Sequence, residues 1–234
     1  MADSKIVKPS GTISSTEEGC VVLLHGLVRS SRSMRRLAQA FEKAGYEVVN
    51  VNYPSRQHKI EHLAPLAVHD LGASQCINQQ RVNIVTHSMG GILTRYYLAE
   101  NSIPNLGRVV MLAPPNQGSI VVDNLKKVPG FYSLNGPAGM QLGTDEHSIP
   151  SQLPEVDFEL GVIAGSRSIN PLLSLQIPNP DDGTISAAST RVAGMRDYLL
   201  LPVTHTFLMR SKKVIDQAIF FIQHGNFKRD AVDQ

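Results

Sequence analysis

The feature that most constrains the fold is a series of six short apolar runs, separated by segments with helical periodicity. The runs are Cys20–Leu24, Glu47–Val51, Val82–Thr86, Val109–Leu112, Leu160–Ala164 and Tyr198–Leu201. They are nearly continuous instead of alternating between apolar and polar residues, which is typical of strands covered on both faces. The pattern therefore predicts an α/β fold, in which a minimal, mostly parallel sheet of about six strands carries helices on both faces.

Apolar residues recur at helical spacing in four segments, residues 34–41, 60–71, 90–100 and 212–223. In the first segment we expect Ser33 to be the N-cap and Gly45 to mark the stop. Pro65 should bend the second helix or delay its start, because proline lacks a backbone N–H.

Two segments interrupt this rhythm. Residues 114–157 are rich in Gly, Pro and Ser and are too long for an ordinary loop. Residues 166–186 form a second irregular stretch. Both would leave the sheet at the carboxyl ends of strands, where open α/β sheets bind their ligands. We expect one α/β domain over residues 1–234, with residues 114–157 as a small cap or lid.

Composition excludes several functions. Hydrophobic residues make up 42% of the chain and charged residues 18%, which is enough for a packed core. The net charge is +2 and the basic residues are scattered, so nucleic acid is not an expected partner. Neither a CxxC pair nor an HExxH motif is present, and no metal site is predicted.

The sequence also bears on where the protein works. The first twenty residues lack the apolar core of a signal peptide, and no apolar stretch has the length of a transmembrane segment. We therefore expect a soluble cytoplasmic protein. Cys20 and Cys76 are then expected to be buried free thiols in a reducing compartment.

The third apolar run ends at T-H-S-M-G, residues 86–90, which matches a strand–nucleophile–helix turn except at its first position. Such a turn holds the nucleophile at its apex in a strained backbone, so small residues are needed where the chain crosses itself. Gly90 meets this need, whereas Thr86 stands where glycine is commonest. Ser88 is the candidate nucleophile; the alternative is that Ser88 simply caps the following helix.

A serine hydroxyl needs a base to remove its proton, and the base needs an acid to orient it. On this fold the acid and then the base follow the serine in the chain. His205, in P-V-T-H-T-F directly after the sixth run, is the candidate base. Asp181 and Asp182 compete for the acid in N-P-D-D-G-T-I-S, which can also be read as an ordinary β-turn. The flexible Gly183 favours Asp182 and leaves Asp181 facing solvent.

An oxyanion hole requires backbone N–H donors aimed at the developing negative charge. The expected donors are Met89, directly after the nucleophile, and Leu27, in the H-G-L loop after the first run. Gly26 would let this loop turn, and His25 would pin it by a hydrogen bond. We expect the His87 side chain to point away from the site. The remaining histidines receive no role.

Taken together, V-V-L-L-H-G-L, V-T-H-S-M-G-G, D-D-G-T-I-S and V-T-H-T-F resemble the α/β-hydrolase family, and within it the small bacterial lipase-like serine esterases. The resemblance runs from about residue 20 to about residue 224 and preserves the order of the motifs. It implies a triad of Ser88, His205 and Asp182, with Leu27 and Met89 as oxyanion donors and no metal or cofactor.

The function that follows is hydrolysis of acyl esters through an acyl-enzyme, by an esterase or a lipase. A thioesterase, an acyltransferase and a non-catalytic ligand-binding relative remain alternatives, since fold does not set substrate. The expected partner is a small acyl ester, with possible transient contact with a lipid interface and a monomer favoured. Apolar residues of the cap could line an acyl pocket or simply pack the insertion; they are Ile120, Val121, Val122, Leu125, Val128, Phe131, Tyr132 and Leu134.

Overall fold

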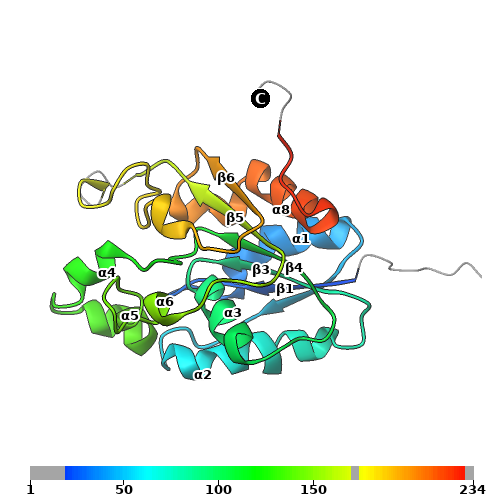
Figure 1. Ribbon diagram of the computed structural model, residues 1–234, viewed down its shortest axis with the longest axis horizontal. Coiled ribbons are helices and arrows are strands. Elements are labelled where there is room, and N and C mark those ends of the chain that lie inside the picture. The colour runs from blue at the N-terminus through cyan, green and yellow to red at the C-terminus, as the bar shows by residue number, and fades with distance from the viewer. Residues whose placement is uncertain (1–18, 170–173, 230–234) are drawn as a thin grey trace, which may run out of the picture.

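The computed structural model describes residues 19–169 and 174–229, and these residues form an α/β fold around one sheet (Figure 1). Within these ranges the sheet has six strands, all parallel, in the order β2-β1-β3-β4-β5-β6. The strands are β1 (Cys20–Leu24), β2 (Glu47–Val51), β3 (Val82–His87), β4 (Leu106–Leu112), β5 (Leu160–Gly165) and β6 (Asp197–Leu201). The predicted fold class is confirmed, and two strands match their predicted bounds.

Helices cover both faces of the sheet (Figure 1). The α-helices are α1 (Arg35–Lys43), α2 (Ile60–Ala64), α3 (Met89–Glu100), α4 (Ile120–Leu125), α5 (Phe131–Met140), α6 (Ile149–Gln152) and α8 (Lys212–His224). Shorter 3₁₀ turns are η1 (Ser31–Met34), η3 (Ala73–Cys76), η4 (Ala188–Thr190) and η5 (His205–Arg210), and η2 (Pro65–Asp70) is π-helical. One face packs against α1 and α8, and the other against α2 and α3.

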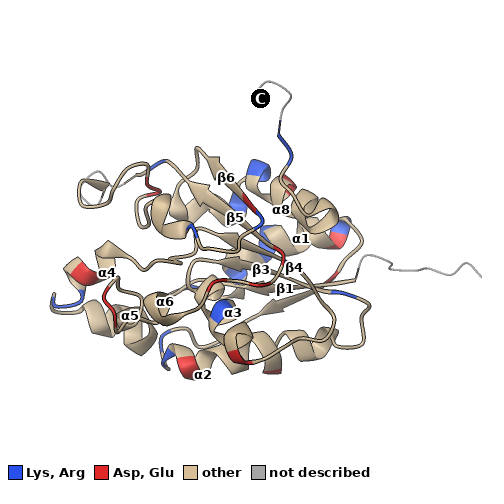
Figure 2. Cartoon of the chain, in the orientation of Figure 1, with Lys and Arg blue, Asp and Glu red and all other residues tan. Residues whose placement is uncertain are grey.

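Strand β1 shows why the apolar runs are continuous. Val21 and Leu23 belong to the core under α1 and α8, whereas Val22 and Leu24 belong to the core under α2 and α3. Successive side chains of a strand point to opposite faces, so a strand buried on both sides needs apolar residues at every position. Figure 2 shows that basic and acidic residues are interspersed along the chain, which matches the small net charge.

Two helix details differ from the prediction or refine it. Ser33 is not the N-cap of α1, because it lies inside η1 and its hydroxyl donates to the Ser30 carbonyl at 2.7 Å. Gly45 has a φ of 93° just after α1 ends, as a helix stop requires. Pro65 does not end the helical stretch; it begins the wider π-helical segment that continues α2.

The expectation of free thiols is wrong. Cys20, at the start of β1, and Cys76, in η3, form a disulfide with a Cα–Cα distance of 5.8 Å. Both residues are fully buried. The pairing depends on η2 and η3 packing over β1, a contact that sequence spacing does not reveal. In the residues that the structure describes, no helix combines the length and the hydrophobicity needed to cross a bilayer.

The two irregular segments leave from the carboxyl ends of neighbouring strands. The first follows β4 and contains α4, α5 and α6, which lie together at one side of the sheet (Figure 1). The second follows β5, and its described part leads through η4 to β6. This edge of the sheet also carries the end of β3, so the candidate site residues lie where the fold leaves room for a ligand.

Candidate active site

Ser88 occupies the apex of the turn between β3 and α3. Its φ and ψ are 52° and −122°, a strained conformation for a residue with a side chain. The backbone is fixed there because the Ser88 N–H donates to the Leu112 carbonyl at 2.8 Å. The Ser88 side chain makes no capping hydrogen bond to α3, which removes the capping alternative and leaves the hydroxyl free for chemistry.

The glycines after Ser88 permit this turn. A Cβ on Gly90 would lie 2.8 Å from the Leu24 carbonyl oxygen, and a Cβ on Gly91 would lie 3.0 Å from Cβ of Pro114. Thr86, the departure from the commonest pattern, is fully buried. Its Oγ1 would be 3.3 Å from a Cβ on Gly91, so the absent side chain at Gly91 makes room for the threonine.

His205 and Asp182 form a buried pair, and His205 lines a cavity together with Ser88. Nδ1 of His205 lies 2.7 Å from Oδ2 of Asp182, and the His205 N–H donates to the Asp182 carbonyl at 3.0 Å. The other carboxylate oxygen, Oδ1, accepts the N–H groups of Thr184 and Ile185 at 3.0 and 2.8 Å. Asp182 is therefore held in one orientation and occupies Nδ1 of the imidazole, which leaves Nε2 available.

Asp181 does not face solvent, contrary to the prediction. Its side chain is buried, accepting the hydroxyl of Ser174 at 2.5 Å and the N–H of Gly183 at 2.7 Å. The tight D-D-G turn sends the two carboxylates in different directions, and both find donors inside the protein. Of the two, only Asp182 contacts the imidazole of His205.

His87 also departs from the prediction, because its side chain lines the cavity together with Ser88 and His205. The rings of His87 and His205 are 4.8 Å apart, and Nε2 of His87 lies 3.1 Å from the His205 carbonyl oxygen. Burial lowers the pKa of His87 well below its usual range, so the neutral ring donates Nε2–H to that carbonyl. Strand alternation could not reveal that the His205 loop packs over this side chain.

The loop after β1 is held by His25, as the sequence predicts. Nδ1 of His25 lies 2.9 Å from the Gly26 carbonyl oxygen. Tyr53, which the sequence did not single out, stacks on His25 at 4.1 Å between ring centroids and donates its hydroxyl to the His25 carbonyl. Burial lowers the pKa of His25, which favours the neutral ring in this structural role.

This loop runs directly against the nucleophile. A Cβ on Gly26 would lie 2.9 Å from Nδ1 of His87 and 3.1 Å from Cβ of Ser88. Leu27, the next residue, lines the cavity with Ser88. Met89 is the first residue of α3, so its N–H has no acceptor within the helix. Leu27 and Met89 thus flank Ser88, and their roles as oxyanion donors stay predictions.

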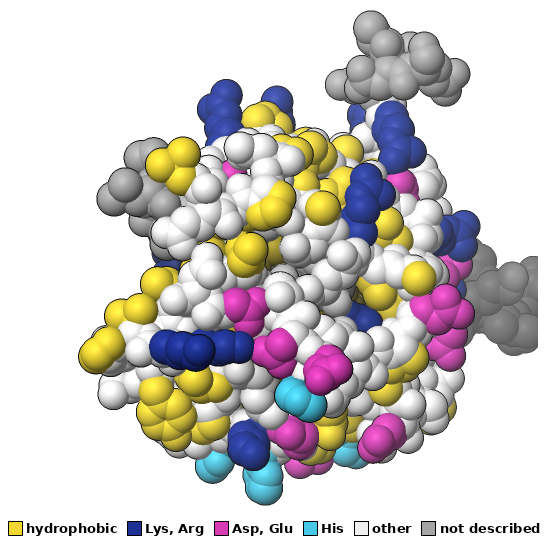
Figure 3. All heavy atoms as spheres, turned by 60° about the vertical axis from the view of Figure 1, so that its left-hand side comes forward, with side chains coloured by type: hydrophobic (Ala, Val, Ile, Leu, Met, Phe, Trp, Pro, Cys, Tyr) yellow, Lys and Arg dark blue, Asp and Glu magenta, His cyan; other side chains and the backbone are white. Residues whose placement is uncertain are grey.

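The cavity beside Ser88 has a volume of about 410 Å³. Apolar residues of the cap form much of its wall: Val121, Val122, Phe131, Leu134 and Leu142. The first four belong to the apolar set that the sequence singled out, whereas Val128 and Tyr132 of the same set are about half exposed, at 48% and 59%. The cap therefore contributes to both a pocket and an outer apolar surface (Figure 3).

A buried arginine fastens the cap to the sheet domain. Arg95 of α3 donates from Nη1 to the Asn116 carbonyl at 2.9 Å and from Nη2 to the Leu153 and Pro154 carbonyls at 3.3 and 2.9 Å. Burial lowers the pKa of Arg95 to about 10. Because Asn116 and Pro154 stand near the two ends of the cap, one side chain anchors both ends.

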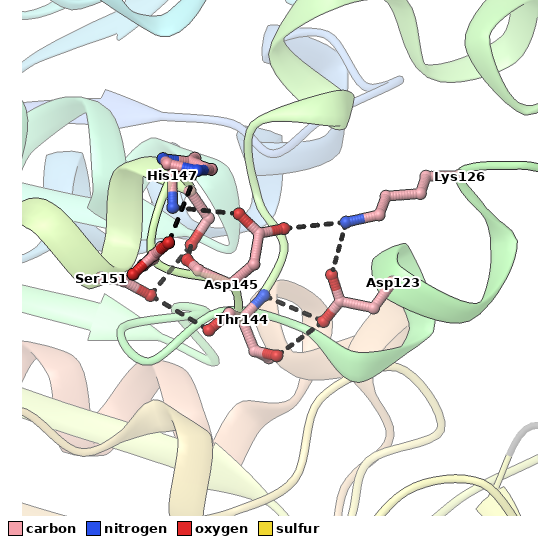
Figure 4. A network of polar contacts seen from close by, with 8 residues as sticks. Asp123, Lys126, Thr144, Asp145, His147 and Ser151 are labelled. Carbon is pink, nitrogen blue, oxygen red and sulfur yellow. Dashed lines mark hydrogen bonds and ion pairs between the residues drawn. The ribbon is translucent and has the colours of Figure 1, made fainter.

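A polar network stabilises the cap itself (Figure 4). Nζ of Lys126 lies 3.1 Å from Oδ1 of Asp123 and 2.8 Å from Oδ2 of Asp145. Oδ2 of Asp123 accepts the N–H and hydroxyl of Thr144 at 2.9 and 2.7 Å. The network ties α4, which presents Val121 to the cavity, to the chain before α6.

A family model described as the alpha/beta hydrolase fold matches residues 19–136. No curated protein sequence matches the chain.

Several solved structures share the fold. The mature form of Bacillus licheniformis lipase BlEst2 is 18% identical, with a TM-score of 0.67, over 88% of this chain and 91% of that one. Phospholipase PlaB from Legionella pneumophila is 18% identical, with a TM-score of 0.62, over 88% of this chain and 59% of that one. The metagenomic carboxyl esterase MGS0156 is 16% identical, with a TM-score of 0.64, over 86% and 68% of the two chains. At these identities the likeness is one of fold.

Proposed function

We propose that this chain, which belongs to the alpha/beta hydrolase fold family, is a serine hydrolase that cleaves carboxylic esters. The observation that carries the proposal is the buried Asp182–His205 pair, whose His205 lines one cavity with Ser88, a residue at a strained turn. Backbone strain at a serine that shares a cavity with an oriented imidazole costs about 1–3 kcal/mol, and a catalytic use accounts for it.

The mechanism assigns one role to each residue. Nε2 of His205 takes the Ser88 proton as the hydroxyl attacks the ester carbonyl, while Asp182 stabilises the imidazolium that forms. The N–H groups of Leu27 and Met89 stabilise the oxyanion. The imidazolium then protonates the departing alcohol, and a water activated by His205 releases the acid from the acyl-enzyme. No metal or cofactor enters these steps.

The apolar cap wall supports an acyl substrate, because an acyl chain in contact with Val121, Phe131 and Leu134 is removed from water. The names of solved structures with the same fold, a lipase, a phospholipase and a carboxyl esterase, agree with ester hydrolysis. A lipase differs from an esterase in its response to an interface. A sharp rise in rate where a long-chain ester exceeds its solubility would favour a lipase, and smooth saturation an esterase.

The decisive test is labelling with a fluorophosphonate probe, which reacts with an activated serine. We expect one adduct on Ser88 that is lost in Ser88→Ala. Ser119→Ala is the matched control, because Ser119 lines the same cavity but lies outside the strained turn, and it should label normally. An unlabelled wild-type protein would favour a non-catalytic binding role instead.

The class of ester is settled by a substrate panel. Esters of varied acyl length, one thioester and one alcohol acceptor should be compared at equal concentration. Fastest turnover of the thioester, or transfer to the alcohol in preference to water, would replace the ester hydrolase proposal with the thioesterase or acyltransferase alternative, which use the same triad.

A further inference from the structure

A second groove lies beside the cavity that holds Ser88. Its volume is about 420 Å³, and Val28 and Arg29 line both spaces. Its other polar lining residues are Ser30, Asn52, Ser55, Arg56 and Gln57. The two spaces therefore meet at Val28 and Arg29, and the second is a polar compartment that the ester chemistry itself does not use.

The charge of this groove has one sign. Two arginines line it, and its lining contains neither Asp nor Glu. Arg29 is exposed and, within the ranges that the structure describes, has no ion-pair partner. Its charge also contributes to lowering the pKa of His87, which agrees with a position close to the site.

Arg56 links the groove to the cap. Its Nη1 donates to the Leu134 carbonyl of α5 at 3.4 Å, and Leu134 lines the main cavity. The segment before α2 that contains Arg56 lies next to α5 (Figure 2). One long hydrogen bond leaves most of the five guanidinium N–H donors available for a ligand.

We infer that this groove binds a phosphate group on the alcohol part of the substrate, so that the preferred substrates are acyl esters of phosphate-bearing alcohols. This inference rests on the proposed ester hydrolase function. The apolar cavity suits the acyl chain, which leaves the alcohol part for the groove. Guanidinium groups bind phosphate through paired, charge-assisted hydrogen bonds. In the reaction the ester C–O bond breaks and the acyl group passes to Ser88. The phosphate-bearing alcohol departs with a proton from His205, and water then takes the acyl group from Ser88.

The test compares two substrates that differ only in the phosphate, 1-octanoylglycerol 3-phosphate and 1-octanoylglycerol. The readout is the ratio of their kcat/KM values in the full chain. We expect a ratio well above ten that falls about tenfold in Arg56→Gln and further, toward one, in the Arg29→Gln, Arg56→Gln double variant, since each charge-assisted contact contributes about that much. Arg35→Gln removes an exposed arginine of α1 that lines neither space, and its ratio should match wild type.

Other arms separate the explanations. A ratio of one in the wild type, or a ratio that both groove variants leave unchanged, would overturn the phosphate site while the ester hydrolase stands. Cleavage of the octanoyl ester of glycerate faster than that of 1-octanoylglycerol 3-phosphate would reassign the groove to a carboxylate. Equal inhibition by inorganic phosphate and by glycerol phosphate would make the groove a site for free anions. Either result overturns the inference. Failure to cleave both esters together with no fluorophosphonate adduct would instead refute the proposed function.

Discussion

Adjacent carboxylates in one turn have different tasks here. Asp182 contacts the imidazole of His205, whereas Asp181 holds Ser174 and the Gly183 N–H. We predict that Asp182→Asn lowers kcat by roughly 10³-fold or more, because an amide in this position disfavours the reactive tautomer of the imidazole. Asp181→Asn should mainly lower the free energy of unfolding. Steady-state kinetics and urea unfolding of both variants measure this, and a larger loss of kcat in Asp181→Asn would reverse the assignment.

Two buried histidines give the fold a dependence on pH. Burial lowers the pKa of His25 and of His87 below the ordinary 6.5. Below pH 6.5 the unfolded chain binds protons that the folded chain does not, so the free energy of unfolding falls as the pH drops. Each group contributes a slope of up to about 1.4 kcal/mol per pH unit below that pH, and its stabilisation is complete above it.

The check is urea unfolding between about pH 5 and pH 8. His87→Gln keeps an N–H donor for the His205 carbonyl but cannot titrate, so the acid slope should decrease by about one proton. If the His87→Gln variant shows the same acid slope of unfolding free energy against pH as the wild type, His87 is not the cause of that slope.

At the scale of elements, the cap depends on charges that are only partly buried. The side chains of Lys126, Asp123 and Asp145 are 27%, 22% and 45% exposed, so their ion pairs should contribute little to global stability. We predict that Lys126→Met changes the free energy of unfolding little but speeds proteolysis within residues 114–157. Lys127→Met is the matched control, because Lys127 is exposed and adjacent to Lys126.

Limited proteolysis with mass spectrometry locates the cuts. Equal cleavage of the two variants would mean that the Lys126 network does not hold α4 in place. A loss of global stability with unchanged cleavage would point to Arg95 as the dominant tie between the cap and α3, since Arg95 is buried and donates to three carbonyls of the cap.

The helix boundaries show what local pattern determines at this scale. Gly45 ended α1 as predicted, because a positive φ is a local property that glycine permits. Ser33 failed as a cap, because the loop from β1 enters α1 through η1 and moves the helix start. The way in which this loop leads into α1 depends on the residues that the loop packs against.

At the scale of the whole molecule, the disulfide joins β1 to η3, which is 56 residues away in the sequence. We predict that the chain denatured without reductant shows no thiol that reacts with Ellman's reagent, and two after reduction, because Cys20 and Cys76 are paired. Two reactive thiols before reduction would restore the free thiols that the sequence favours. Disulfides persist mainly in oxidising compartments, so the result also bears on the cytoplasmic location, which stays a prediction.

The sequence by itself determined the parallel sheet, its helical layers and the residue types of the candidate triad. Continuous apolar runs and the order of Ser88, Asp182 and His205 are properties of the sequence, so they can be read without knowledge of tertiary contacts. Only the tertiary structure decided which carboxylate contacts the imidazole, where the His87 side chain points and which groups surround Val28 and Arg29. These depend on which loops meet at the carboxyl edge of the sheet, and packing between segments far apart in sequence sets that meeting.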